Sequence, residues 1–136
     1  MINFNYETEF SINNETEITD WITNVISEEN FILDEINYTF CNDDQMLKLN
    51  VEYLNHDTLT DIISFDNSIG KIIQGDIFIS IERVVDNAKD FKVSLEEELH
   101  RVMVHGVLHY CGYKDKSESE SKLMRQKEDY YIKQLA

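Results

Sequence analysis

The chain has 136 residues, of which 42% are hydrophobic and 11% aromatic. This length and composition predict one globular domain spanning 1–136 and exclude a disordered chain. Twelve Lys and Arg residues against 27 Asp and Glu residues give a formal net charge of −15, which opposes unaided binding to a polyanion because affinity for phosphate backbones comes mainly from Lys and Arg.

The first half of the chain alternates between strand-like and helix-like patterns. Residues 2–6 alternate apolar and polar side chains and predict a strand. A helix is expected next, capped by Thr16, because apolar residues recur at helical spacing after it: Ile18, Trp21, Ile22, Val25 and Ile26. Residues 36–40 predict a second strand. A second helix is expected after Asp43, continuing through Tyr53.

The second half begins with two short apolar segments, at 61–65 and 76–80, which predict strands. A helix is expected over 81–91. Ser94, with a glutamate three residues later, is typical of a capping box and predicts the start of a long helix. A last helix is expected after a cap at Ser117 or Ser119. These elements predict a mixed α+β fold with about four strands and about five helices.

The cysteines and the N-terminal residues indicate the compartment. Two cysteines, Cys41 and Cys111, are too few for a disulfide framework and indicate a reducing environment. The first residues have neither the basic flank nor the apolar segment of a signal peptide, and no apolar run approaches the roughly 20 residues of a membrane span. We therefore expect a cytoplasmic protein that does not associate with membranes.

The most informative stretch is His105-Gly-Val-Leu-His109, followed by Gly112 and Asp115. Histidines four apart on a helix lie on one face, roughly 6 Å apart, and are able to share one metal ion. Gly112 is expected to end the helix as a left-handed cap, so that the chain returns the carboxylate of Asp115 towards both rings. Zinc takes imidazole nitrogen and carboxylate oxygen, and a catalytic site keeps one position open for water. The pattern predicts one zinc ion per chain, held by His105, His109 and Asp115.

Alternatives to this site remain open. A pair of histidines four apart is more often helix surface or a hydrogen-bonded core pair than a metal site. Cys111 is a second candidate for the third ligand, because thiolate binds zinc well, although it would face sideways on a continuing helix. His100 should point away from the pair, and His56 is interpreted as a solvated loop histidine. Cys41 is expected to be a buried residue at a strand end.

Four segments together resemble the YbeY family of rRNA maturation factors, which are described as single-strand-specific endoribonucleases. They are Leu-Asn-Val-Glu-Tyr at 49–53, Asp-Thr-Leu-Thr-Asp-Ile-Ile-Ser-Phe at 57–65, Gly-Asp-Ile-Phe-Ile-Ser at 75–80 and His-Gly-Val-Leu-His-Tyr-Cys-Gly-Tyr at 105–113. They occur in the family's order, and the resemblance covers about residues 46–131.

The resemblance implies a single metal-dependent hydrolase domain, with a small mixed sheet packed with helices and a central metal helix similar to that of zinc peptidases. It implies an endoribonuclease that acts in rRNA processing, 16S rRNA 3′ end maturation and ribosome quality control. Its substrate would be an rRNA precursor, and its partner a ribosomal protein or the small ribosomal subunit. A metal-bound water held through His105 and His109 would be the nucleophile. The alternative is a ribosome-assembly binding factor with a structural or vestigial metal site.

The chain departs from the family pattern in ways that bear on mechanism. Asp115 stands where the family usually has its third histidine, and Lys114 where it has an aspartate. Leu54 stands where the family usually has an arginine thought to bind phosphate, and Leu59 replaces a proline. Gly106 occupies the position at which metallopeptidases carry a general-base glutamate, so we do not expect peptidase activity.

Further candidates are weaker. Asp61 and Asp76 belong to segments that the family keeps near the site, and each is equally well interpreted as a structural residue. Ser64 is a candidate for a hydrogen bond in the cleft, although an ordinary strand serine is the simpler interpretation. A local basic surface for RNA would draw on seven residues, each more simply explained as helix-surface charge: Lys89, Lys92, Arg101, Lys114, Lys116, Lys122 and Arg125.

Overall fold

The computed structural model describes residues 1–54 and 60–135. Within them lie four strands, five α-helices and one short π-helical turn, in this order: β1 (Ile2–Tyr6), α1 (Glu15–Glu28), β2 (Ile32–Cys41), α2 (Asp43–Leu49), η1 (Asn50–Leu54), β3 (Ile62–Asp66), β4 (Ile72–Ser80), α3 (Ile81–Phe91), α4 (Leu95–Tyr110) and α5 (Glu118–Leu135). Across these ranges, no helix combines the length and apolar character needed to cross a membrane.

The strands form one mixed sheet in the order β1-β2-β4-β3. β1, β2 and β4 are parallel, and β3 is an edge strand that runs antiparallel to β4. α1 provides the crossover that a parallel β1–β2 pair requires. The predicted α+β fold with a mixed four-stranded sheet is therefore confirmed.

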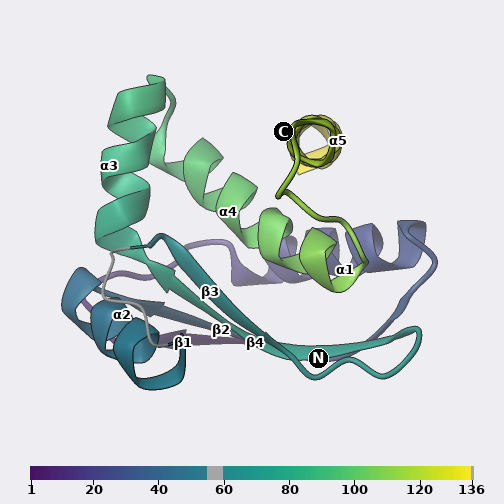
Figure 1. Ribbon diagram of the computed structural model, residues 1–136, viewed down its shortest axis with the longest axis horizontal. Helices are drawn as coiled ribbons and strands as arrows, with labels where there is room; N and C mark the ends of the chain where they lie inside the picture. The colour runs from purple at the N-terminus through teal and green to yellow at the C-terminus, as the bar shows by residue number, and fades with distance from the viewer. Residues whose placement is uncertain (55–59, 136) are drawn as a thin grey trace.

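Helices cover the two faces of the sheet unequally (Figure 1). α1 and α4 bury their apolar sides in one main core with the sheet, and α5 adds Met124 and Tyr131 to it. α2 packs on the opposite face, where Met46 meets Cys41 and Ile63. In Figure 1, α4 crosses above the sheet with α5 beside it, while α2 lies below. The long motif helix is thus held between the sheet and α5.

Several predicted boundaries are corrected by the structure. β2 and β4 begin four residues earlier than predicted, at Ile32 and Ile72, because these residues pair with each other beyond an irregular register near Glu35. α1 begins at Glu15 after Asn14, so Thr16 lies inside the helix and is not its cap. α2 ends at Leu49, and the remainder of the predicted helix is the π-helical turn.

The predicted caps of the later helices are confirmed. Ser94 accepts a hydrogen bond from the backbone of Glu97 at 3.0 Å and begins α4. Ser117 accepts from the backbone of Glu120 at 3.1 Å, and the Glu120 carboxylate accepts in return from the backbone of Ser117 at 2.9 Å. This reciprocal pair begins α5 and selects Ser117 over Ser119.

Candidate metal centre

The end of α4 turns the chain back on itself as predicted. The helix ends at Tyr110, with Cys111 as its C-cap, and Gly112 follows with φ +100°, a left-handed conformation that costs glycine little. The hydroxyl of Ser121 on α5 then donates to the backbone carbonyl of Asp115 at 2.8 Å. This bond holds the returning segment against the first turn of α5.

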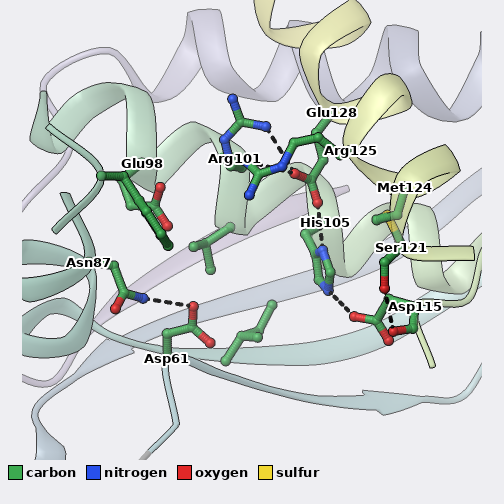
Figure 2. A pocket seen from close by; sticks show the side chains of 13 residues that line it. Asp61, Asn87, Glu98, Arg101, His105, Asp115, Ser121, Met124, Arg125 and Glu128 are labelled. Atoms are coloured by element: carbon green, nitrogen blue, oxygen red, sulfur yellow. Dashed lines mark hydrogen bonds and ion pairs between the residues drawn. The ribbon is translucent and has the colours of Figure 1, made fainter. Parts of the chain in front are cut away.

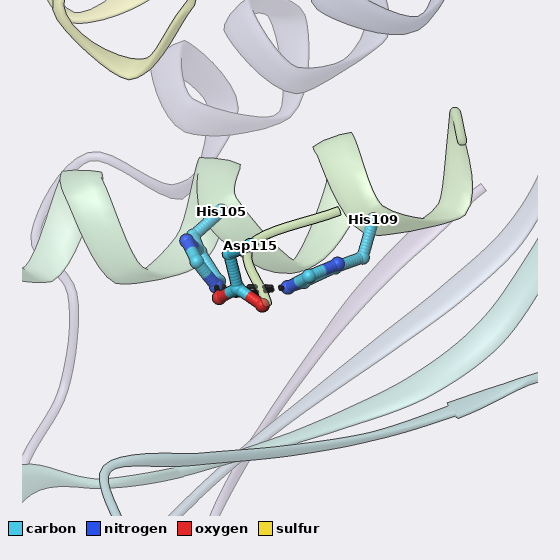
Figure 3. Close-up of side chains that lie close together, drawn as sticks. All are labelled: His105, His109 and Asp115. Atoms are coloured by element: carbon cyan, nitrogen blue, oxygen red, sulfur yellow. Dashed lines mark hydrogen bonds and ion pairs between the residues drawn. The ribbon is translucent and has the colours of Figure 1, made fainter. Parts of the chain in front are cut away.

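Three side chains converge beneath α4 (Figure 3). Nε2 of His105 lies 2.9 Å from Nε2 of His109. One carboxylate oxygen of Asp115 lies 3.1 Å from the first nitrogen and 3.5 Å from the second. All three residues are partly or largely accessible, so the group faces solvent on one side. Among the described residues, this is the set of His, Cys, Asp and Glu side chains close enough to share a metal ion.

The hydrogen bonds behind the two rings decide which way their lone pairs point. Nδ1 of His109 faces the carbonyl oxygen of Tyr113 at 2.9 Å, and Nδ1 of His105 faces a carboxylate oxygen of Glu128 at 2.6 Å. Both partners are acceptors, so each Nδ1 carries a hydrogen and each neutral ring presents an Nε2 lone pair to the other and to Asp115. Three acceptors facing one another repel unless a proton or a metal cation lies between them.

The spacing of the three atoms also suits zinc. Ligands about 2.0–2.1 Å from a tetrahedral ion lie about 3.3–3.4 Å from one another. The three observed separations, 2.9, 3.1 and 3.5 Å, bracket that value. The residues present therefore fit a small tetrahedral ion with three protein ligands and one open position.

Glu128 contacts the candidate metal centre, and the sequence patterns did not predict this. Only 4% of it is exposed, and besides His105 its carboxylate accepts from Arg101 at 3.0 Å. Burial alone lowers the pKa of His105, but the hydrogen bond and charge of Glu128 outweigh it, so that pKa lies above its ordinary value of 6.5. A signal was available: Glu128 lies four residues after Met124 and three before Tyr131, on the face of α5 that the apolar pattern buries.

A second network holds the segment after α4 in place. The carboxylate of Glu29, which follows α1, accepts hydrogen bonds from the hydroxyls of Tyr113 (2.7 Å) and Tyr131, and from Lys127 at 3.3 Å. Burial opposes the charge of Glu29, yet these hydrogen bonds and the Lys127 charge lower its pKa below the ordinary value. The carbonyl that orients His109 therefore belongs to a residue anchored to α1.

A pocket of about 360 Å³ opens beside His105 and Asp115 (Figure 2). Its walls come from α3, α4, α5 and the residues that lead into β3. In this pocket, Asp61 accepts a hydrogen bond from the amide of Asn87 at 3.2 Å. Glu98, two turns before His105 on α4, is 4% exposed. Burial raises the pKa of both Asp61 and Glu98. The predicted metal ligands thus border a pocket that is also lined by the carboxyl groups of Asp61 and Glu98.

Comparisons with known proteins show which family the chain belongs to. The model of the family described as Endoribonuclease YbeY matches residues 2–136. The chain belongs to the YbeY family. It is 67% identical over 132 residues to Endoribonuclease YbeY of Flavobacterium johnsoniae, a match that covers 97% of this chain and 95% of the relative. It is 62% identical over 133 residues to Endoribonuclease YbeY of Flavobacterium psychrophilum, with 98% and 95% covered.

A solved structure has the same fold. The solution structure of TM1509 from Thermotoga maritima superposes with a TM-score of 0.74 at 26% sequence identity, covering 99% of this chain and 89% of that one. The resemblance to the YbeY family in the sequence motifs is therefore confirmed along nearly the whole chain.

Asp61 and Asp76, the two candidate aspartates from the YbeY-like segments, have different surroundings. Asp61 lines the pocket. Asp76 accepts a hydrogen bond from Asn37 at 3.1 Å, while its neighbour Ile77 packs in the main core. Because side chains alternate along a strand, Asp76 faces away from α4. It is a structural residue of the sheet, one of the two interpretations that the sequence allowed.

Gly106, the second residue of the YbeY motif, faces the sheet and not the pocket. A Cβ built on Gly106 would lie 3.0 Å from the end carbons of both Ile62 and Ile77. A glutamate at this position would point into packed side chains. The fold therefore has no room for the general base of a metallopeptidase there.

The remaining candidates are placed as follows. His100 points away from the pair and packs its ring against Trp21 at a centroid distance of 5.7 Å. Cys111 is partly buried against the main core, outside the three-residue cluster, and burial raises its pKa to about 12. Cys41 is buried at the end of β2, as predicted.

Ser64 lies in register with Ile77 on the side of β3 that faces α4, and is exposed. His56, Leu59 and the side chain of Leu54 lie outside the described residues.

Proposed function

We propose that this protein is a zinc-dependent, single-strand-specific endoribonuclease that hydrolyses phosphodiester bonds in an rRNA precursor, in 16S rRNA 3′ end maturation and ribosome quality control. The observation that carries the proposal is the convergence of two Nε2 lone pairs and one carboxylate oxygen within 3.5 Å of one another. The high identity to proteins named Endoribonuclease YbeY supports RNA as the substrate class.

In this proposal, His105, His109 and Asp115 hold one zinc ion per chain. When bound, zinc supplies a Lewis acid and lowers the pKa of a coordinated water. Glu128 and the Tyr113 carbonyl keep both rings in the tautomer that presents Nε2. Asp61, whose pKa burial raises, faces the same pocket and is suited to exchange a proton with the attacking or leaving oxygen.

The charge of the chain shapes how RNA reaches this site. The chain carries a net charge of −15, and Arg101 in the pocket is already paired with Glu128 at 3.0 Å and Asp129 at 2.9 Å. Long-range attraction to RNA is therefore weak. We infer a basic ribosomal protein or the small ribosomal subunit as the partner that brings the substrate, and the cytoplasm as the location.

The same acidic charge favours a second candidate function, a ribosome-assembly factor whose metal site is structural. In that case the wild-type protein would bind zinc without cleaving RNA. Substitution of His109 would lower the unfolding temperature while removing no activity.

One experiment separates the two candidates. Purified protein loaded with zinc is incubated with a single-stranded rRNA fragment and with the matching duplex, with and without a chelator. The endoribonuclease predicts cleavage of the single strand that the chelator and His109→Ala both abolish. His100→Ala serves as the matched histidine control, because His100 lies on the same helix but packs against Trp21 away from the cluster, and it should cleave normally. A zinc-loaded wild-type protein that leaves the single strand intact would contradict the proposal.

A further inference from the structure

Phe91 stands at the edge of the pocket beside the candidate metal centre. It is the last residue of α3, and Lys92 ends the helix after it with φ 58°. Its side chain is 57% exposed and belongs to neither apolar cluster of the described residues. Yet it lines the same pocket as His105 and Asp115. An aromatic ring that takes no part in the core is thus presented to this pocket.

Arg125 is the second unusual feature of the pocket. Of the two guanidinium groups that line it, Arg101 is 15% exposed and makes two close ion pairs. Arg125, on α5, is 53% exposed, and its ion pair with Glu128 is 3.9 Å long, beyond hydrogen-bond distance. Figure 2 shows both guanidinium groups close to Glu128. The hydrogen-bond donors of Arg125 are therefore available to an incoming anion.

The other charges in the pocket determine where such an anion binds. Four carboxylates line it: Asp61, Glu98, Asp115 and Glu128. They repel phosphate from most of the wall, so that a phosphate group is admitted next to Arg125 and the metal centre. A neutral aromatic group meets no such penalty beside Phe91. The lining is thus divided between an anion position and a position for an uncharged ring.

A polar group on the same face of α3 as Phe91 suits the edge of a base. Asn87 lies four residues earlier, on the same face of the helix, and lines the same pocket. Its amide donates to Asp61 at 3.2 Å, which orients the side chain. The amide oxygen of Asn87 and the carboxylate of Asp61 therefore line the same pocket as the Phe91 ring and offer acceptors to the edge of a base.

We propose that this pocket is a nucleotide subsite in which Phe91 stacks on one unpaired base and Arg125 contacts the adjoining phosphate. The inference rests on the proposed function and specifies how the RNA is held. The volume of about 360 Å³ is at the small end of ligand pockets and suits a single nucleotide. A base inside a duplex is already stacked on its neighbours, so only a single strand is able to supply the ring. The subsite thus gives a physical basis for a single-strand preference.

The test measures binding and cleavage separately. Fluorescence anisotropy measures the affinity for a labelled single-stranded rRNA fragment. The measurement is repeated with a series of variants of this fragment, each of which lacks the base at one position. Loss of one base–aromatic stack should weaken binding by about 5-fold to about 150-fold. We expect Phe91→Ala to weaken binding by about tenfold and Phe91→Trp to retain it. The affinity of the wild-type protein should fall by the same factor when the fragment is abasic at the position that stacks on Phe91. Phe91→Ala should bind that abasic fragment as weakly as it binds the unmodified one.

Arg125→Gln provides the second arm. It should weaken binding to every fragment and reduce the slope of log affinity against log salt by about one phosphate contact. Tyr130→Ala, an exposed aromatic outside the pocket, and Lys133→Gln, an exposed cation on the same helix, are the matched controls and should bind like wild type.

The outcomes distinguish this inference from the proposed function. If the wild-type protein cleaves RNA while Phe91→Ala binds equally well and shows the same abasic profile, the subsite is wrong and the endoribonuclease stands. If the wild-type protein binds with the predicted abasic profile but cleaves nothing, the endoribonuclease is wrong and the subsite stands. A failure of the wild-type protein to bind any single-stranded fragment contradicts both.

Discussion

Glu128 and His105 are joined by a hydrogen bond of 2.6 Å between a carboxylate oxygen and Nδ1 of the ring. The other carboxylate oxygen accepts from Arg101 at 3.0 Å, so the acid is held from both sides. The two residues are 23 positions apart and come from different helices. A carboxylate behind a metal-binding histidine fixes the ring orientation and raises the basicity of the free nitrogen.

Glu128→Gln should therefore lower zinc affinity by about tenfold, because the neutral amide polarises His105 less. Zinc affinity is measured by competition with a chromophoric chelator. Glu118→Gln, an exposed acid in the first turn of the same helix, is the control and should leave the affinity unchanged. Equal affinity in the wild type and Glu128→Gln would show that the contact does not act on the metal site.

Asp115→Ala should weaken zinc binding by at least about 100-fold, because it removes one of three protein ligands. Asp115→His should retain tight binding, since imidazole is an equally good zinc ligand. Stoichiometry by elemental analysis after dialysis distinguishes the two variants. The exposed Asp44→Ala controls for the loss of one negative charge. Full zinc occupancy in Asp115→Ala would exclude this carboxylate as a ligand.

Two glycines that contact α4 or belong to it should respond to alanine to different extents. A Cβ on Gly75 would lie 2.6 Å from both the carbonyl oxygen of Phe65 and the hydroxyl of Tyr110. That hydroxyl donates to the carbonyls of Phe65 and Asp76, which ties α4 to β3 and β4. Gly75→Ala should therefore lower the free energy of unfolding by about 1–3 kcal/mol.

Gly106→Ala is the matched comparison. Its Cβ would meet only the flexible end carbons of Ile62 and Ile77 at 3.0 Å, and alanine favours a helix by about 1 kcal/mol over glycine. We expect a change in the free energy of unfolding within about 1 kcal/mol, measured by urea titration. A greater loss for Gly106→Ala than for Gly75→Ala would contradict this description of the helix–sheet contact.

Glu29 should make stability depend on pH in the acid range. Its pKa is lowered in the folded protein, so its contribution is complete above the unfolded value of 4.5 and is lost as pH falls through the folded pKa. Glu29→Gln should cost about 1–3 kcal/mol of unfolding free energy at pH 7, because Tyr113, Tyr131 and Lys127 lose a charged acceptor. Urea titrations of both proteins at pH 7 and pH 3 test this. The difference should shrink at pH 3, and a constant difference would show that the charge is not involved.

The elements of the fold were predictable where the apolar pattern was long or a cap was local. α1 and α4 carry complete apolar faces, and Ser94 and Ser117 cap through backbone groups three residues away. The ends of β2 and β4 were not predictable. Ile32 and Ile72 become strand residues by pairing with each other, and the residues next to each of them in the sequence do not predict that pairing.

The sequence by itself determined the three side chains that converge, because a four-residue spacing on a helix and a glycine stop are local constraints on the backbone. It also determined the family, since the motif residues stand in order along one chain. Only the tertiary structure decided that Glu128 stands behind His105, that Asp76 faces away from the site, and that Phe91 and Arg125 share its pocket. Those relationships depend on how α3, α5 and the sheet pack around α4. Contacts between segments far apart in the sequence produce no regular residue spacing from which they could be predicted.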